Sequence, residues 1–125
     1  MQGGIEGQRL IVQRYRECIG HLNNGIIIEP SISDPFQWKV VMIPNTGFLK
    51  DRIINGYIRF ENFPSAIPKV IFPPDVIHPL IGPDQIFDCS GKFYEWKADT
   101  PVYGLLNFVY ESLSKTTLPF SSILI

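Results

Sequence analysis

Alternating side chains in two neighbouring segments constrain the fold of this chain more than any other feature of its sequence. In FQWKVVMI (residues 36–43) and INGYIRF (residues 54–60), an apolar residue or glycine recurs at every second position. Because successive side chains of a β-strand point to opposite faces, this period of two predicts a strand with one buried face in each segment. Asn45-Thr46-Gly47 supplies a turn or loop between the two strands.

Two shorter segments are expected to complete the sheet. Ile26–Ile28 is β-branched throughout and precedes Pro30, and Val70–Phe72 is stopped by Pro73-Pro74. β-branched residues favour strands, and proline ends pairing because it lacks the N–H that a sheet requires. The four strands follow one another along the chain, which predicts a meandering antiparallel sheet.

One helix is expected before the first strand and another after the last strand. Residues 9–22 carry apolar side chains at helical spacing, and Asn23-Asn24-Gly25 is expected to end this first helix. Thr100 is expected to cap a second helix, with Pro101 at its first position. The apolar face of the first helix comprises Ile11, Tyr15, Cys18, Ile19 and Leu22, and that of the second comprises Val102, Leu105, Leu106, Val109 and Leu113.

The composition fits a single α+β domain over residues 1–125, in which the helices cover the sheet. A chain of 125 residues that is 45% hydrophobic can bury one core but not two. Residues 1–7 and 118–125 are expected to be flexible ends of this domain.

Charge and cysteine content exclude several classes of function. Lys and Arg total 11 and Asp and Glu total 12, so no broad positive field favours nucleic acid as a partner. The sequence has no apolar run long enough for a membrane span and no secretory signal, which predicts a cytoplasmic or nuclear protein. Cys18 and Cys89 lack the spacing of a zinc or redox motif, so neither a metal nor a cofactor is expected.

The tract from residue 73 to residue 99 is where we expect the functional site, because long aperiodic loops in compact domains usually serve a function. Cys89 is either a nucleophile or an inert loop cysteine. His78 is either a general base or a residue that orders the loop. Asp84 and Asp88 are either a catalytic carboxylate pair or turn residues.

Ordered motifs make this chain resemble the ubiquitin-conjugating (UBC-like) domain. Phe63-Pro64, followed by Pro68-Lys69-Val70 and Phe72, is similar to the YPxxxPKVxF run of that family, and His78-Pro79 follows at the family's usual spacing. The resemblance implies a UBC-like fold with an N-terminal helix, a four-stranded antiparallel meander, a long active-site-like loop and a second helix. The two further C-terminal helices of full-length enzymes are absent from this pattern.

The family's catalytic cysteine commonly lies ten residues after the histidine and eight before a tryptophan. In this chain both counts, from His78 and from Trp96, reach Asp88, while Cys89 lies one residue late. Leu80 stands where the family motif carries an asparagine credited with the oxyanion role. The resemblance thus implies a catalytically inactive variant, and the alternative is a divergent active enzyme that forms a thioester on Cys89 with His78 beside it. The vestigial site comprises His78, Pro79, Leu80, Asp88, Cys89 and Trp96.

The resemblance also nominates surfaces for partners. Arg9, Arg14 and Arg16 lie on the predicted outer face of the first helix, where the family meets the ubiquitin-activating enzyme. Ser65 and Lys97-Ala98 replace residues that contact ubiquitin ligases. Within the superfamily the chain is most similar to the fused-toes (Akt-interacting) variants. The expected partners are ubiquitin or a ubiquitin-like protein, and an active conjugating enzyme or an adaptor complex.

Overall fold

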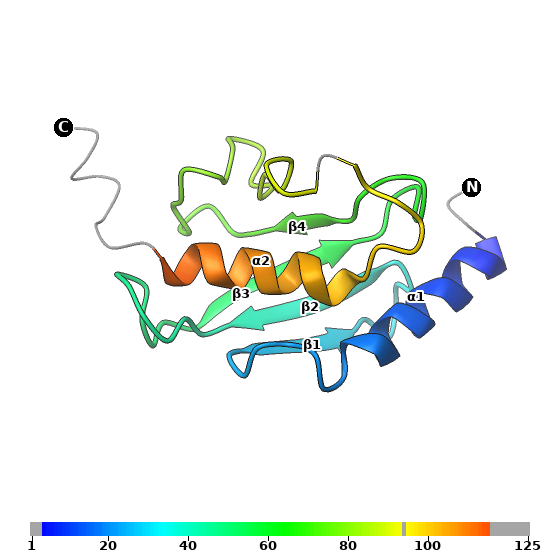
Figure 1. The fold of residues 1–125 in the computed structure, drawn as a ribbon, viewed down its shortest axis with the longest axis horizontal. Helices are drawn as coiled ribbons and strands as arrows, with labels where there is room; N and C mark the ends of the chain where they lie inside the picture. The colour runs from blue at the N-terminus through cyan, green and yellow to red at the C-terminus, as the bar shows by residue number, and fades with distance from the viewer. Residues whose placement is uncertain (1–3, 94, 116–125) are drawn as a thin grey trace.

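The domain is a four-stranded antiparallel sheet, preceded by one helix and followed by another along the chain (Figure 1). The computed structural model describes residues 4–93 and 95–115. Helix α1 spans Gly4–Cys18 and helix α2 spans Val102–Ser114. The strands are β1 (Ile26–Pro30), β2 (Gln37–Met42), β3 (Ile54–Arg59) and β4 (Lys69–Ile71). The predicted α+β architecture is confirmed.

The strands pair in the order in which they occur, β1-β2-β3-β4, so the sheet is the predicted meander. Trp38 pairs with Ile58, and Ile58 pairs with Val70, so one row of large side chains crosses three strands. All three are buried. The alternation read from the sequence therefore sets the inner face of the sheet.

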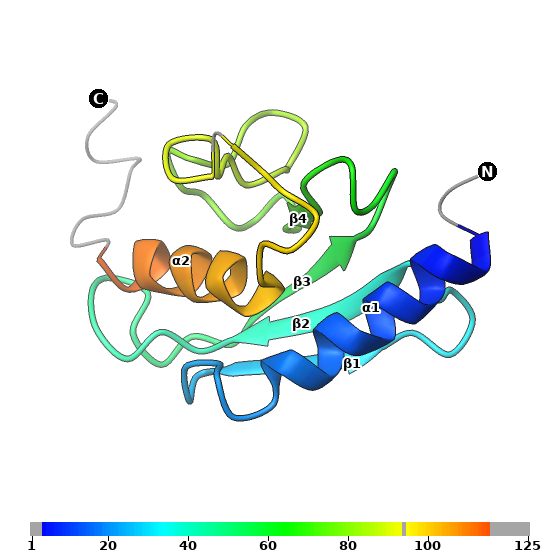
Figure 2. The ribbon, with the colours of Figure 1, turned by 45° about the vertical axis from the view of Figure 1, so that its right-hand side comes forward.

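Helix α2 lies across this inner face in both views (Figure 1 and Figure 2). Its buried side chains include all five residues of the predicted apolar face. The helix begins without a side-chain cap, because Pro101 occupies the N-cap position and the hydroxyl of Thr100 accepts the N–H of Lys97 at 3.1 Å. The prediction that Thr100 caps α2 was therefore wrong: its hydroxyl closes the preceding turn.

Helix α1 ends earlier and begins earlier than the sequence predicted. Its last residue is Cys18, and Gly20 adopts a φ of 84°, a left-handed conformation in which glycine pays no steric penalty. Ile19, predicted on the buried face, lies beyond the helix and is exposed. Residues 4–7, expected to be flexible, are helical; residues 1–3 and 118–125 lie outside the described residues. Neither described helix is both long and apolar enough to cross a membrane.

Candidate functional site

The tract after β4 is more regular than its sequence suggested. Isolated antiparallel bridges join Ile71 to Ile86 and Ile81 to Phe87. The N–H of Phe87 donates to the oxygen of Val70 at 2.8 Å, so the tract folds back along the free edge of β4. Sequence periodicity missed this pairing because single bridges leave no repeating pattern.

A tight turn at residues 82–86 reverses the direction of this tract. The N–H of Gln85 donates to the oxygen of Gly82 at 2.9 Å, and the carboxylate of Asp84 accepts the N–H of Ile86 at 3.1 Å. Asp88 makes the same kind of local bond to the N–H of Ser90 at 2.9 Å. Both carboxylates thus serve turns, as their short side chains readily do.

His78 connects the tract to α2. Its ring is buried, Nε2 lies 3.2 Å from the backbone oxygen of Ser112, and Nδ1 accepts the N–H of Leu80 at 3.1 Å. An Nδ1 that accepts a hydrogen bond requires a neutral ring with its proton on Nε2, which then donates to Ser112. Burial lowers the pKa of His78, and the bond to Ser112 offsets this effect only in part. The arrangement orders the backbone at Leu80.

Asp88 and Cys89 occupy opposite environments. The N–H of Asp88 donates to the oxygen of Leu80 at 2.6 Å, and its carboxylate is exposed, with a pKa lowered by hydrogen bonds from the side chain and backbone of Ser90. Cys89 is only 6% exposed, and its thiol lies 3.8 Å from the oxygen of Phe87. Burial, with a smaller effect from the charge of Asp88, raises the pKa of Cys89 to about 12. The thiolate is therefore strongly disfavoured.

A groove of about 680 Å³ runs beside these two residues. Its walls come from residues 66–69, which lead into β4, and from residues between 82 and 93. Asp88 and Cys89 both contribute to the lining, whereas His78 is not among the described residues that line it. No group of three or more His, Cys, Asp or Glu side chains within residues 4–93 and 95–115 is arranged to hold a metal ion.

Comparison with solved structures places this arrangement in a known fold. Human ubiquitin-conjugating enzyme E2 G1 superposes with a TM-score of 0.75 at 18% sequence identity, over 87% of this chain and 95% of that chain. This chain has the ubiquitin-conjugating-enzyme fold. The UBC fold accounts for the meander, the helix on its inner face and the long tract between β4 and α2.

Sequence comparison adds more specific relatives. The Protein crossbronx homolog of Anopheles gambiae is 32% identical over 117 residues, which are 87% of this chain and 51% of the relative. Protein crossbronx of Drosophila virilis is 30% identical over 97 residues, 74% of this chain and 40% of the relative. The chain spans about half the length, or less, of these curated relatives. No family model matches the chain.

Trp96 anchors the end of the UBC-fold tract. Its ring nitrogen donates to the oxygen of Pro64 at 3.1 Å, and its ring contacts those of Phe63 and Phe93. The tryptophan therefore fastens the tract to the chain segment that leads into β4. Ser65, which follows Pro64, is exposed at this corner, and Pro79 is exposed at the other end of the tract.

One nominated contact residue is not on the surface. Arg14 is only 8% exposed, whereas Arg9 and Arg16 are exposed. The guanidinium of Arg14 donates to both carboxylate oxygens of Glu17, at 2.7 and 2.8 Å, and to the backbone oxygen of Ala98 at 3.0 Å. The prediction that Arg14 lies on the outer face of α1 was therefore wrong, because its side chain joins α1 to the loop after Trp96. Lys97 and Ala98 are themselves exposed on that loop.

Sequence reasoning also missed an exposed apolar stripe on α1. Ile5 and Val12 point to solvent, as does Ile19 just beyond the helix. Their spacing of seven residues was the signal that could have found the stripe.

Proposed function

We propose that this chain is a catalytically inactive UBC-fold module that binds partners of the ubiquitin pathway as a cofactor or adaptor. Its partners would be ubiquitin or a ubiquitin-like protein, and an active conjugating enzyme or an adaptor complex. The observation that carries the proposal is the environment of Asp88 and Cys89. The residue in the nucleophile position is an exposed carboxylate, and the only neighbouring thiol is buried.

Thioester chemistry needs an accessible thiolate. Because burial raises the pKa of Cys89 to about 12, its thiol is almost entirely un-ionised at neutral pH. Ubiquitin transfer to an amine also passes through an oxyanion, and the side chain of Leu80 has no hydrogen-bond donor for it. Loss of one such donor typically slows a reaction by about 100- to 1000-fold. The un-ionised thiol hinders formation of the thioester, and the missing donor at Leu80 hinders transfer to the amine. Together the two deficits support a binding role.

One observation favours a second candidate, a divergent enzyme that carries a modifier on Cys89. Cys89 contributes to the wall of the groove, so the groove is the side from which a modifier would approach its sulfur.

A charging assay separates the two functions. The full chain is incubated with activating enzyme, ATP and a panel of ubiquitin-like modifiers, beside a Cys89→Ala variant and a Cys18→Ala control. The proposal predicts no thiol-sensitive adduct on a non-reducing gel. An adduct lost in Cys89→Ala and retained in Cys18→Ala would instead establish the enzyme.

Binding is tested separately. Titration of ubiquitin, ubiquitin-like proteins and active conjugating enzymes into the isotopically labelled chain should shift amide signals for at least one of them. The proposal fails if every titration leaves the spectrum unchanged. This role predicts a cytoplasmic or nuclear protein, and imaging of the tagged protein in its native cell would test that prediction.

A further inference from the structure

The end of the domain at which α2 ends carries a group of exposed apolar side chains. Ile53 is 68% exposed, Ile77 is 61% exposed and Phe48 is 40% exposed. Ile53 and Ile77 line one cleft of about 180 Å³, between the loop that leads into β3 and the segment that follows β4. Phe48 is linked to them through Arg52, which lines the same cleft and has its guanidinium carbon 5.1 Å from the centre of the Phe48 ring. We call Phe48, Ile53 and Ile77 the α2-end patch.

The segments that form the two walls of this cleft are both bonded to the last turn of α2. The hydroxyl of Thr46 donates to the backbone oxygen of Ser114 at 2.9 Å. On the other wall His78 directly follows Ile77, and its Nε2 lies 3.2 Å from the backbone oxygen of Ser112. Figure 1 shows the loop between β2 and β3, together with the segment after β4, at the end of the domain where α2 ends. The chain therefore leaves α2 beside the patch.

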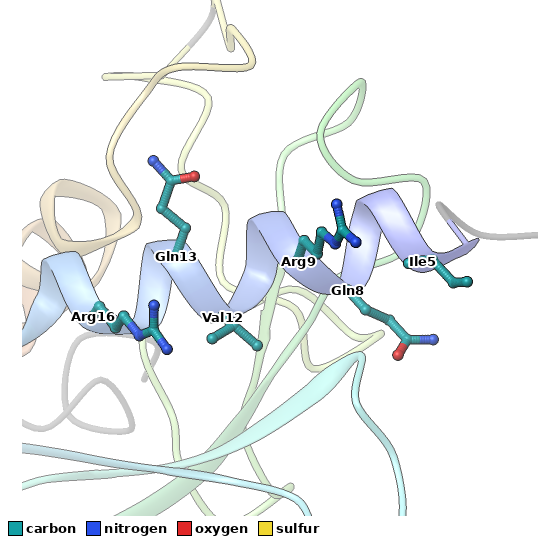
Figure 3. Close-up of a pocket in the computed structure, with 6 residues that line it drawn as sticks. All are labelled: Ile5, Gln8, Arg9, Val12, Gln13 and Arg16. Carbon is teal, nitrogen blue, oxygen red and sulfur yellow. The ribbon is translucent and has the colours of Figure 1, made fainter.

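Other exposed apolar side chains lie away from this patch. Ile5 and Val12 project from α1 (Figure 3), and α1 begins at the opposite end of the domain (Figure 1). Ile32 lies on the loop between β1 and β2, at the other end of β2. Apolar residues scattered singly on a surface are normal, whereas several gathered around a cleft mark an interaction site. The α2-end patch therefore calls for an occupant.

The sequence that follows α2 suits this patch. Residues 118–125, which lie outside the described part of the structure, read LPFSSILI and carry five large apolar side chains and no charge. An uncharged apolar stretch of this kind promotes aggregation unless something covers it. The cleft also favours an uncharged occupant, because Arg52 and Asp75 in its lining have opposite charges. We call residues 118–125 the apolar segment.

The apolar segment is close enough to reach the patch. Six residues separate Phe120 from Ser114, and an extended chain of that length spans about 20 Å. Because both walls of the cleft contact the last turn of α2, this reach is ample. A short tether also holds a segment near its site at an effective concentration that is roughly millimolar. A separate protein has no such advantage.

The size of the cleft and the end of α2 both fit such a segment. An apolar cavity of about 150 Å³ holds a benzene ring, so a cleft of about 180 Å³ has room for the ring of Phe120. The hydroxyl of Ser114 is buried and lacks a hydrogen-bond partner among the described residues. Buried polar groups are almost always paired, and a segment folded back over the last turn of α2 would bring backbone groups beside this hydroxyl.

We propose that the apolar segment folds back and docks on the α2-end patch of the same chain, with the ring of Phe120 in the cleft between Ile53 and Ile77. The patch is then occupied from within the chain and closed to other proteins. It includes no residue of the vestigial site, so the inference goes beyond the proposed function and does not depend on it.

A cysteine placed in the patch tests whether the apolar segment covers it. Ile53→Cys is made in the full chain, with and without the pair Phe120→Ser and Ile123→Ser, and its reaction with a maleimide is followed by mass spectrometry. The serines remove apolar side chains and add no charge, so they should speed the reaction at least tenfold. Cys18 and Cys89 are 0% and 6% exposed, and the unsubstituted chain gives their background rate.

Two further variants complete the design. Ile77→Cys repeats the measurement on the opposite wall of the cleft and should respond in the same way. Ile32→Cys is the matched control, because Ile32 is fully exposed at the other end of β2, and its rate should be the same with and without the serines. Circular dichroism checks that each variant keeps the fold, which is expected because the three substituted isoleucines are exposed.

Three results would overturn the inference. Equal rates for Ile53→Cys with and without the serines would show that the apolar segment does not cover the patch. Protection that weakens on dilution would identify a second copy as the source of the segment. An equal acceleration of Ile32→Cys would mean that the segment covers no particular surface. None of these results bears on the charging assay, which follows Cys89.

Discussion

The guanidinium of Arg14 donates a hydrogen bond to the backbone oxygen of Ala98 at 3.0 Å, across 84 residues of sequence. The same group donates to both carboxylate oxygens of Glu17, while its Nε is buried without a hydrogen-bond partner among the described residues. The contact fixes the loop after Trp96 against α1. The loop nominated as a partner surface is therefore held in place by a residue that was itself nominated as a partner contact.

Replacement of Arg14 by Ala should lower the free energy of unfolding by about 2–3 kcal/mol, because partly buried hydrogen bonds to a charged group are lost and Glu17 loses its ion-pair partner. Urea unfolding at neutral pH measures the change. Arg16→Ala is the control, since the exposed Arg16 should alter stability by less than about 0.5 kcal/mol. Equal effects of the two substitutions would contradict the assignment of Arg14 as a tether.

The buried thiol of Cys89 should make stability decrease at alkaline pH. Its pKa is about 12 in the folded chain against 9.0 for a free thiol, so the unfolded chain loses this proton first. The contribution of the protonated Cys89 thiol to the free energy of unfolding is complete below pH 9. It is lost as pH rises from 9 toward 12, at up to about 1.4 kcal/mol per pH unit. Urea unfolding between pH 9 and 10.5 should show a shallower decline for Cys89→Ala than for the unsubstituted chain. Parallel declines would mean that the thiol ionises equally in both states.

Acid should weaken the domain through His78. Burial lowers its pKa from the usual 6.5, so below pH 6.5 the unfolded chain takes up a proton that the folded chain refuses. The contribution of His78 is therefore present above pH 6.5 and is lost as pH falls through the folded-state pKa. A His78→Gln variant can retain a donor toward Ser112 but cannot be protonated. Its free energy of unfolding should change less between pH 7 and pH 5 than that of the unsubstituted chain; an equal change would assign the acid sensitivity to other groups.

Gly25 should tolerate no side chain. A Cβ at this position would lie 2.5 Å from the oxygen of Ile43 and 2.6 Å from the hydroxyl of Tyr110, so Gly25→Ala must displace Tyr110 on α2 or shift the backbone at Gly25 and Ile43. Overpacking of this kind costs about 1–3 kcal/mol. Thermal unfolding measures the loss, with Gly91→Ala as the matched control, because a Cβ at Gly91 meets nothing within 4 Å. A neutral Gly25→Ala would show that this contact is looser than the structure indicates.

The sequence predicts which residue stands at each position of the candidate site, but it does not predict whether that residue is exposed or buried. The counts from His78 and Trp96 predict, through the resemblance to the family motif, that Asp88 stands in the nucleophile position. The exposure of Asp88 and the burial of Cys89 depend on how the tract pairs with the edge of β4. That pairing involves residues far apart in the chain, and no local pattern reports it.

The sequence by itself determined the four strands, the inner face of the sheet and the apolar face of α2. The spacing of apolar residues is a local property of the sequence, and in these elements the apolar side is the side that packs against the core. Only the tertiary structure decided that Arg14 is buried, that Thr100 serves a turn and that Ile19 is exposed beyond the end of α1. Each of these outcomes depends on a hydrogen-bond partner, or on a change in the path of the chain, that exists only in the folded domain. A helical wheel cannot place a charge that finds its acceptor 84 residues away.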